Sequence, residues 1–296
     1  MVMSSYNGAK YISQQIDSVL SQDLAGTADL SLYVRDDGST DGTCQILQSY
    51  EDVQMLELIK GENIGVCKSF ISLLQAIPQD YDYVALCDQD DVWHANKLFR
   101  AISVLSSTDQ NIAQLYCSEF IFCDADLNIV RKSQLNKCGV CFEKLLFENI
   151  CSGNTMVMNR TLHRIVASSD SEGVYCHDWW IALLAASFGD VYFDKNFYSL
   201  DYRRIGSNAS PAGSDMIKLF IYRLNKFIRG GDLKRIESQL QKLQCEMGER
   251  LDPEKALTLN MFLRKGRLQK AFANIRLRQT LSSELMLRIL FLSGLL

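Results

Sequence analysis

Short apolar runs alternate with helical patterns along the first hundred residues of the chain. Strands are predicted at residues 2–5, 30–34, 53–59 and 83–87. Between them, apolar positions that recur every three or four residues predict helices at 8–22, 40–50, 65–77 and 96–105. This alternation is typical of a mostly parallel sheet covered by helices on both faces, so we expect an α/β domain.

The pattern changes in the second half of the chain. Apolar runs predict strands at 115–123, 156–158 and 191–193, and a helix at 179–187. From Asp215 onward, long basic amphipathic helices are expected instead. Pro211, Gly213 and Ser214 form a hinge-like segment at the change. We therefore predict a domain over residues 1–210 and a helical extension over 211–296.

Charge follows the same division. The net charge of −4 over 296 residues combines −12 for residues 1–214, with 15 basic and 27 acidic side chains, and +8 for residues 215–296, with 16 basic and 8 acidic ones. Such asymmetry indicates two segments with different partners. The content of 47% apolar and 22% charged residues excludes a disordered chain.

Neither a secretory signal nor a membrane-spanning segment is expected. The longest apolar stretch, Leu285–Leu296, is interrupted by Arg288 and falls short of the roughly 20 residues that a spanning helix needs. Of ten cysteines, only Cys138 and Cys141 form a CxxC pair, and no second pair or histidine cluster completes a zinc site. We interpret the cysteines as reduced thiols of a cytoplasmic protein.

Two acidic clusters follow predicted strands: Asp36–Asp37 and Asp88–Asp91. Ligands of parallel sheets bind beyond the carboxyl ends of the strands, where both clusters fall. Carboxylates are hard oxygen ligands, suited to Mg²⁺ or Mn²⁺ held jointly with substrate phosphates. The alternative is a solvated acidic turn. An EF-hand is excluded because position 12 is Leu47 or Gln48, and neither a GxxxxGK[ST] nor a GxGxxG motif occurs.

Several motifs occur in an order that carries a family resemblance. They are Ser5-Tyr6-Asn7-Gly8, Asp36-Asp37-Gly38-Ser39, Asn63-Ile64-Gly65, Asp88-Gln89-Asp90-Asp91, His177-Asp178-Trp179-Trp180 and Tyr202-Arg203-Arg204. Over residues 1–210 the chain resembles a family 2 glycosyltransferase of the GT-A fold, in its rhamnosyltransferase-like branch. The resemblance implies a nucleotide-binding half at about 1–105 and an acceptor half at about 106–210.

The resemblance also implies a donor site for a nucleotide-diphospho-sugar. Ser5 and Tyr6 would form a wall beside the base, and Asp37 would accept the N3–H of uracil or thymine. Asp88, near the ribose, and Asp90 would form the DxD pair that holds Mg²⁺ or Mn²⁺. The residues that the resemblance assigns to donor or metal are Ser5, Tyr6, Asp37, Lys68, Asp88 and Asp90, with Lys68 near the phosphates.

On the acceptor side, the resemblance implies that Asp178 is the general base and that Asn154, Trp179 and Trp180 contact the acceptor. Helix N-capping is the alternative for Asp178, because an acid often precedes an apolar helix. Core packing is the alternative for the tryptophans. Ile205 departs from the family pattern, in which a histidine at this place often completes the metal site.

The basic tail admits several partners. The segment 216–229 is a basic amphipathic helix that suits an anionic membrane interface, while docking onto the catalytic core or a homodimer contact are alternatives. Nucleic acid is not expected, because the main domain is acidic.

Taken together, these features predict an inverting, metal-dependent transferase that moves a sugar, preferably rhamnose, from a dTDP- or UDP-sugar to a glycan or lipid-linked acceptor in surface polysaccharide biosynthesis. It would act in the cytoplasm, at the inner face of the membrane. A non-catalytic sugar-binding module and a scaffold of a membrane assembly complex are the alternatives.

Overall fold

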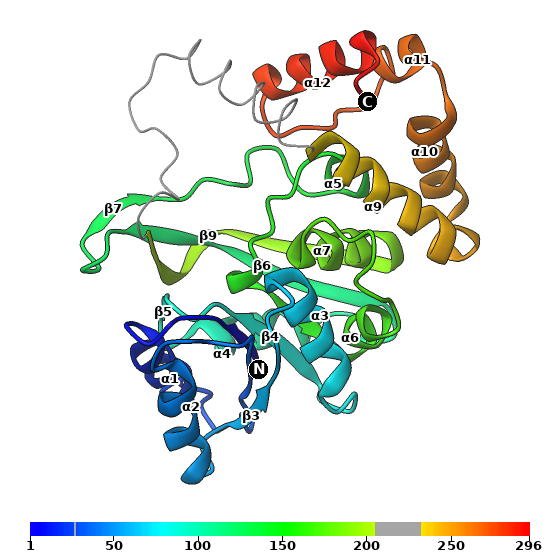
Figure 1. Ribbon diagram of the computed structural model, residues 1–296. Helices are drawn as coiled ribbons and strands as arrows, with labels where there is room; N and C mark the ends of the chain where they lie inside the picture. The colour runs from blue at the N-terminus through cyan, green and yellow to red at the C-terminus, as the bar shows by residue number, and fades with distance from the viewer. Residues whose placement is uncertain (27, 205–231) are drawn as a thin grey trace.

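A computed structural model describes residues 1–26, 28–204 and 232–296 (Figure 1). The strands are β1 (Val2–Ser5), β2 (Tyr33–Asp36), β3 (Glu57–Lys60), β4 (Tyr83–Cys87), β5 (Val92–Trp93), β6 (Ala113–Cys123), β7 (Ile129–Lys132), β8 (Val157–Asn159) and β9 (Gly189–Arg203). The helices of the catalytic part are α1 (Ile12–Leu20), α2 (Thr43–Asp52), α3 (Val66–Ala76), α4 (Lys97–Leu105), α5 (Phe142–Leu145), the 3-10 turn η1 (Gly153–Thr155), α6 (Arg160–Ala167) and α7 (His177–Phe188).

These strands form one mixed sheet in the order β3-β2-β1-β4-β8-β6-β9-β5, with β7 paired to β6. The prediction of parallel pairing is confirmed for β1 to β4, which are joined by crossover helices. Beyond β4 the sheet becomes mixed: β8 runs antiparallel to β4 and β6, and β9 is parallel to β6 but antiparallel to β5. The predicted strand at 191–193 is much longer, because β9 follows β6 along most of its length.

Helix α7 lies at the centre of the protein. Ten of its twelve residues are buried, as expected for a helix that is apolar on every side. One face packs against the sheet, and the other is covered by the C-terminal helices (Figure 1). These are α9 (Asp232–Met247), the 3-10 turn η3 (Gly248–Arg250), α10 (Pro253–Arg264), α11 (Arg267–Ala271) and α12 (Leu281–Ser293).

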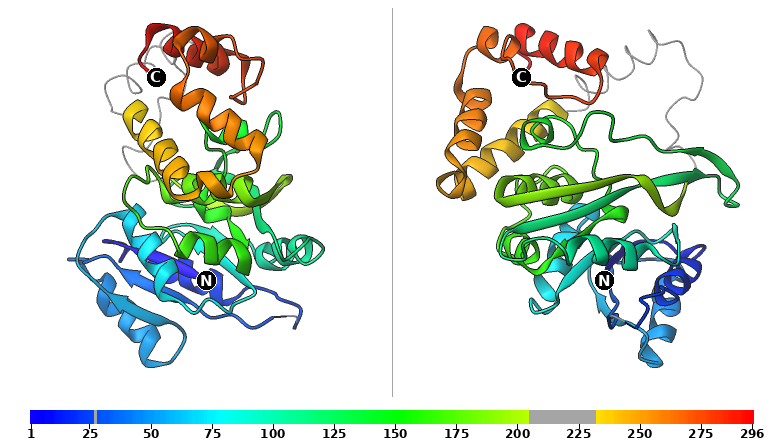
Figure 2. Two further views of the ribbon diagram at one scale, coloured as in Figure 1. Left: turned by 90° about the vertical axis from the view of Figure 1, so that its right-hand side faces the viewer. Right: turned by 180° about the vertical axis from the view of Figure 1, so that it is seen from behind.

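The described C-terminal helices therefore dock onto the catalytic core, which was one of the alternatives for the tail. The ring of Phe147 meets those of Phe262 and Phe291, with centroids 5.0 and 5.3 Å apart. Lys242 of α9 forms an ion pair with Asp170 at 2.7 Å. Figure 2 shows these helices at one end of the molecule and strands β1 to β3 at the other. The predicted helix at 216–229 and the boundary near residue 210 lie outside the described residues.

The ten cysteines are all free thiols in the described part of the chain. Cys138 sits in a loop whose backbone donates to the Gln279 side chain at 2.9 Å, so the CxxC segment is a docking point for the C-terminal helices. Among the described helices, none is long and apolar enough to cross a bilayer.

Candidate active site

The carboxyl ends of β1, β2 and β4 meet around one cavity. Because these strands are adjacent and parallel, the residues that follow them reach the same edge of the sheet. The cavity has a volume of about 420 Å³ and is lined by Ser4, Tyr6, Asp37, Asn63, Gly65, Val66, Asp88, Gln89 and Asp90. The structure thus brings together four residues that the sequence assigned to the donor. Of the other two, Ser5 lies behind the lining with its side chain buried, and Lys68 is exposed on α3, outside the set that lines the cavity.

Gln89 ties the acidic turn to the end of β1. Its Oε1 accepts hydrogen bonds from Ser5 Oγ and from the Tyr6 backbone N–H, both at 2.9 Å, and its Nε2 donates to the Tyr6 carbonyl at 3.0 Å. A Cβ at Gly8 would lie 2.3 Å from Gln89 Oε1, so this loop requires glycine for the close approach. Sequence reasoning missed Gln89, whose only signal was its place between two aspartates.

Asp37 is a buried carboxylate fixed from three directions. Arg35 Nη1 donates to it, as do the backbone N–H groups of Ile64 at 3.1 Å and Gly65 at 2.9 Å. Gly65 adopts a φ of +83°, which favours glycine. A carboxylate offers about four acceptor sites, so these three donors leave one for a ligand.

Asp88 and Asp90 present two carboxyl groups to the cavity. Burial and the nearby carboxylates of Asp90 and Asp178 raise the pKa of Asp88 to about 7. Burial also raises the pKa of Asp90. A cation would relieve this repulsion. In the described residues there is no group of three His, Cys, Asp or Glu side chains that forms a closed metal site. Two carboxylates with room for phosphate oxygens fit Mg²⁺ or Mn²⁺, which commonly uses one or two protein carboxylates.

A buried polar network lies beneath the acidic turn. Asp91 is fully buried and accepts hydrogen bonds from Asn154 Nδ2 at 2.5 Å and from the Arg203 backbone N–H at 3.2 Å. Lys97 is also fully buried: its Nζ donates to the Asn154 carbonyl and lies 3.4 Å from the centroid of the Trp93 ring. Burial lowers the pKa of Lys97 to about 7. Sequence reasoning missed Lys97, because a lysine at a helix start gives no sign of burial.

The place of Asn154 differs from the sequence expectation. Its side chain is 1% exposed and its amide donates to Asp91, so the amide has a buried protein partner in this structure. Its role here is to hold η1 against the acidic turn. The same turn carries Gly153, where an added Cβ would lie 3.1 Å from His177 Nε2 and 3.3 Å from Asp178 Cβ. The network therefore connects the acidic turn to the start of α7.

Asp178 lies in the first turn of α7. The N-cap position is Cys176, and Asp178 accepts a hydrogen bond from the N–H of the adjacent Trp179 at 2.6 Å, so it is not the N-cap residue. Its charge lies close enough to Asp88 to raise the pKa of that carboxyl. The candidate base is therefore near the acidic pair, although it is not among the residues that line the 420 Å³ cavity.

The two tryptophans after Asp178 have different surroundings. Trp180 is fully buried and its Nε1 donates to Ser169 Oγ at 3.0 Å, so core packing, not contact with a sugar, accounts for it. Trp179 is 7% exposed and lines a second cavity of about 400 Å³ between α7 and the C-terminal helices. Tyr175 lines the same cavity, with its ring centroid 5.6 Å from that of Trp179. An acceptor contact remains a prediction for Trp179 alone.

The guanidinium of Arg203 is held by other parts of the protein. Its guanidinium donates to the carbonyls of Asp90 and Ala125 and to the side chain of Gln14 at 2.5 to 2.9 Å. It thereby anchors the acidic turn from the side of β9. Ile205, the position that departs from the family pattern, lies outside the described residues.

Known proteins resemble this chain in sequence and in fold. The sequence model of "Glycosyl transferase family 2" matches residues 1–136. The dTDP-rhamnosyl transferase RfbG of Shigella flexneri is 27% identical over 226 residues, which cover 70% of this chain and 75% of that protein.

Solved structures show the same fold. TarS of S. aureus (residues 1–349), in complex with UDP-GlcNAc, superposes with a TM-score of 0.55 at 14% identity and covers 99% of this chain and 91% of that one. The mannosyltransferase PcManGT of Pyrobaculum calidifontis, in complex with GDP-Man and Mn²⁺, has a TM-score of 0.57 at 16% identity and covers 99% and 73%. Residues 1–136 thus match the model of glycosyl transferase family 2, and the chain has the GT-A fold.

Proposed function

We propose that this protein is an inverting glycosyltransferase that moves a sugar from a dTDP- or UDP-sugar to a hydroxyl of a glycan or lipid-linked acceptor in surface polysaccharide biosynthesis. The observation that carries the proposal is the convergence of Asp37, Asp88 and Asp90 on one cavity, with Asp178 beside Asp88. Rhamnose is the preferred sugar, on similarity to RfbG. The reaction would take place in the cytoplasm, at the inner face of the membrane.

The donor's nucleotide would occupy the 420 Å³ cavity. The remaining acceptor site of Asp37 suits the N3–H of uracil or thymine, and cytosine has no such donor. Tyr6 lines the same cavity, and its half-exposed ring offers a stacking surface for the base. Gln89 keeps Tyr6 in place through its hydrogen bonds to the backbone on both sides of the residue.

Asp88 and Asp90 would hold Mg²⁺ or Mn²⁺ together with the diphosphate. The metal, when bound, supplies a Lewis acid that neutralises the leaving diphosphate. Support comes from the two carboxyl groups at the cavity, which offer hard oxygen ligands and whose raised pKa values a bound cation would lower again. The complex of PcManGT with Mn²⁺ is a precedent within the same fold.

Asp178 would act as the general base. Its carboxylate accepts the proton of the acceptor hydroxyl while the hydroxyl oxygen attacks the anomeric carbon, and the bond to the nucleotide diphosphate breaks on the opposite face. One such displacement inverts the anomeric configuration without an enzyme nucleophile. The hydrogen bond from the Trp179 N–H fixes one carboxylate oxygen and so the orientation of the group.

The test of this proposal is donor binding and donor hydrolysis with a panel of dTDP-, UDP- and GDP-sugars, with and without Mn²⁺. We expect dTDP- or UDP-sugars to bind, Asp37→Ala to lose base selection, and Asp90→Ala to lose the metal requirement together with turnover. Unchanged base selection in Asp37→Ala together with unchanged turnover in Asp90→Ala would refute the assignment of these two residues to the donor site. Donor binding without transfer to any acceptor would favour the non-catalytic module instead.

A further inference from the structure

Helix α12 is apolar on two opposite faces, of which one has no protein partner among the described residues. Met286, Leu287, Leu290 and Phe291 are buried against the core. The other face carries Leu281, Leu285, Ile289 and Leu292, which are 77%, 62%, 48% and 42% exposed. Their spacing of four, four and three residues places them in a single stripe. A helix at the surface of a protein normally has polar residues there.

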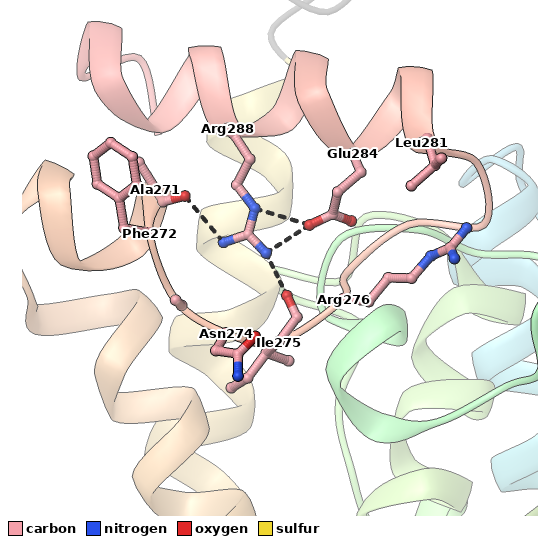
Figure 3. A pocket seen from close by; sticks show the side chains of 9 residues that line it. Ala271, Phe272, Asn274, Ile275, Arg276, Leu281, Glu284 and Arg288 are labelled. Atoms are coloured by element: carbon pink, nitrogen blue, oxygen red, sulfur yellow. Dashed lines mark hydrogen bonds and ion pairs between the residues drawn. The ribbon is translucent and has the colours of Figure 1, made fainter.

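The two charged residues of α12, Glu284 and Arg288, contact other parts of the protein. Figure 3 shows Glu284 and Arg288 directed at the segment 271–276, with Arg288 bonded to the carbonyls of Ala271 and Ile275. Arg288 also forms an ion pair with Glu284 at 2.6 Å. These contacts fix the orientation of α12, so the exposed stripe is a rigid surface and not the result of a loosely packed helix.

More apolar and basic side chains surround the stripe. Phe272 is 75% exposed and lines a cavity of about 370 Å³ together with Leu281 (Figure 3). Arg276 lines the same cavity, at the Leu281 end of the helix. At the other end, the guanidinium of Arg267 lies against Gly294, where an added Cβ would be 2.3 Å from it. Residues 264–296 contain seven basic side chains and one acidic one.

We propose that this surface, the α12 stripe with Phe272 and its flanking arginines, binds an anionic lipid bilayer with α12 lying in the plane of the interface. An exposed apolar stripe flanked by cations is what such an interface recognises. A helix of 13 residues is about 20 Å long, shorter than the roughly 30 Å hydrocarbon core, so α12 lies on the membrane and does not cross it.

Charge disfavours a second copy of the chain as the occupant. A two-fold interface between antiparallel α12 helices would bring Arg276 of one copy close to Arg267 of the other, at both ends of the contact. Like charges brought together in a partly desolvated interface repel each other. A surface of anionic headgroups balances the same arginines.

The proposed surface lies on the C-terminal helices, which pack against the half that the sequence assigned to the acceptor. Phe291 of α12 contacts Phe147, and Arg278, just before α12, donates to the Phe147 carbonyl at 2.6 Å. Strands β1 to β3 lie at the far end of the molecule (Figures 1 and 2). Bilayer contact would therefore keep the donor cavity toward the cytoplasm and the acceptor half toward the membrane. The surface itself does not depend on the catalytic assignment.

The test is vesicle sedimentation of the full chain, with neutral phosphatidylcholine vesicles and with vesicles that contain 30% phosphatidylglycerol as probes. We expect at least tenfold stronger binding to the anionic vesicles, and at least a tenfold loss in the double variant Leu285→Gln/Ile289→Gln, because each aliphatic side chain that leaves water adds to partitioning. The matched control is Val53→Gln/Met55→Gln, two exposed apolar residues of the donor half, which should bind as the wild type does.

Two further measurements keep the proposal open to refutation. The variant Lys265→Gln/Arg267→Gln should lower binding to anionic vesicles several-fold and weaken its dependence on salt. Thermal melts check that each variant is folded. The proposal would be overturned if the protein bound neutral and anionic vesicles equally, or if the α12 variant bound as the wild type does. It would also be overturned if light scattering showed a wild-type dimer that Leu285→Gln separates and the protein bound no vesicles.

Discussion

Replacing Asn154 by alanine tests which of two roles this residue has. The sequence resemblance implies that it contacts the acceptor, and the structure shows it bound to the buried Asp91. In the structure its amide donates to the buried Asp91 carboxylate and accepts from Ser152 Oγ at 2.8 Å. Alanine removes both hydrogen bonds and leaves one oxygen of Asp91 without its donor. The backbone contact between the residue 154 carbonyl and Lys97 would remain.

The cost follows from the contacts that are lost. A hydrogen bond to a charged group contributes about 1.5–3 kcal/mol, and a neutral one about 1 kcal/mol. The side chain is only 1% exposed, so water does not readily replace the amide. We expect the free energy of unfolding to fall by about 2–4 kcal/mol, which corresponds to a melting temperature lower by roughly 5–10 °C.

The assay is a thermal melt and a urea titration of Asn154→Ala beside Ser152→Ala, which removes only the weaker hydrogen bond and should cost about 1 kcal/mol. At a temperature where the variant is folded, donor affinity should stay within about twofold of wild type. If Asn154→Ala left stability unchanged and raised only the KM for acceptor, the residue would contact the acceptor and our account of the network would be wrong.

Three other predictions follow from the site. Trp180→Phe should cost about 2–3 kcal/mol in an unfolding titration, because it loses the bond to Ser169 and part of a fully buried ring, and it should leave the KM for acceptor unchanged. Gln89→Leu should weaken donor binding about tenfold in calorimetry, because Tyr6 loses its anchor; unchanged affinity would refute the anchoring role. Burial lowers the pKa of Lys97 to about 7, so between pH 7 and about 10 the unfolded chain binds more protons at this residue than the folded one. The contribution of Lys97 to the free energy of unfolding therefore rises with pH in that window. Lys97→Met should flatten this rise in melts recorded at several pH values.

Periodicity was sufficient for the elements that pair or pack in the simplest way. The predicted strand at 83–87 coincides with β4, and the helices at 65–77 and 96–105 match α3 and α4 within a residue or two. Alternating strands and crossover helices leave little choice but a parallel sheet. The mixed half was harder to predict: apolar runs indicated short strands at 156–158 and 191–193, but the direction of β8 and the length of β9 depend on long-range pairing with β6.

The site also contains residues that the sequence predicted and residues that it did not. Motif order predicted that Asp37, Asp88 and Asp90 would converge, because all three follow strands of one parallel sheet. Core packing of Trp180 was one of the two alternatives that the sequence left open, and the burial of Asn154 was not predicted, because a polar residue next to a motif has the same letter whether it faces a ligand or the core. Lys97 and Gln89 were missed for the related reason that their importance depends on partners distant in sequence, the Asn154 carbonyl and the Ser5–Tyr6 loop.

Asp178 is the point on which the proposed reaction depends. The most direct measurement is the rate of sugar transfer and, in parallel, the donor affinity of Asp178→Asn, a substitution that keeps the shape of the side chain and removes its basicity. A general base commonly contributes a factor of 10² to 10⁴ in rate. Our account predicts that transfer falls by at least 100-fold while donor binding in the presence of Mn²⁺ changes by less than about twofold. Transfer at the wild-type rate would show that another group accepts the proton and would contradict the account.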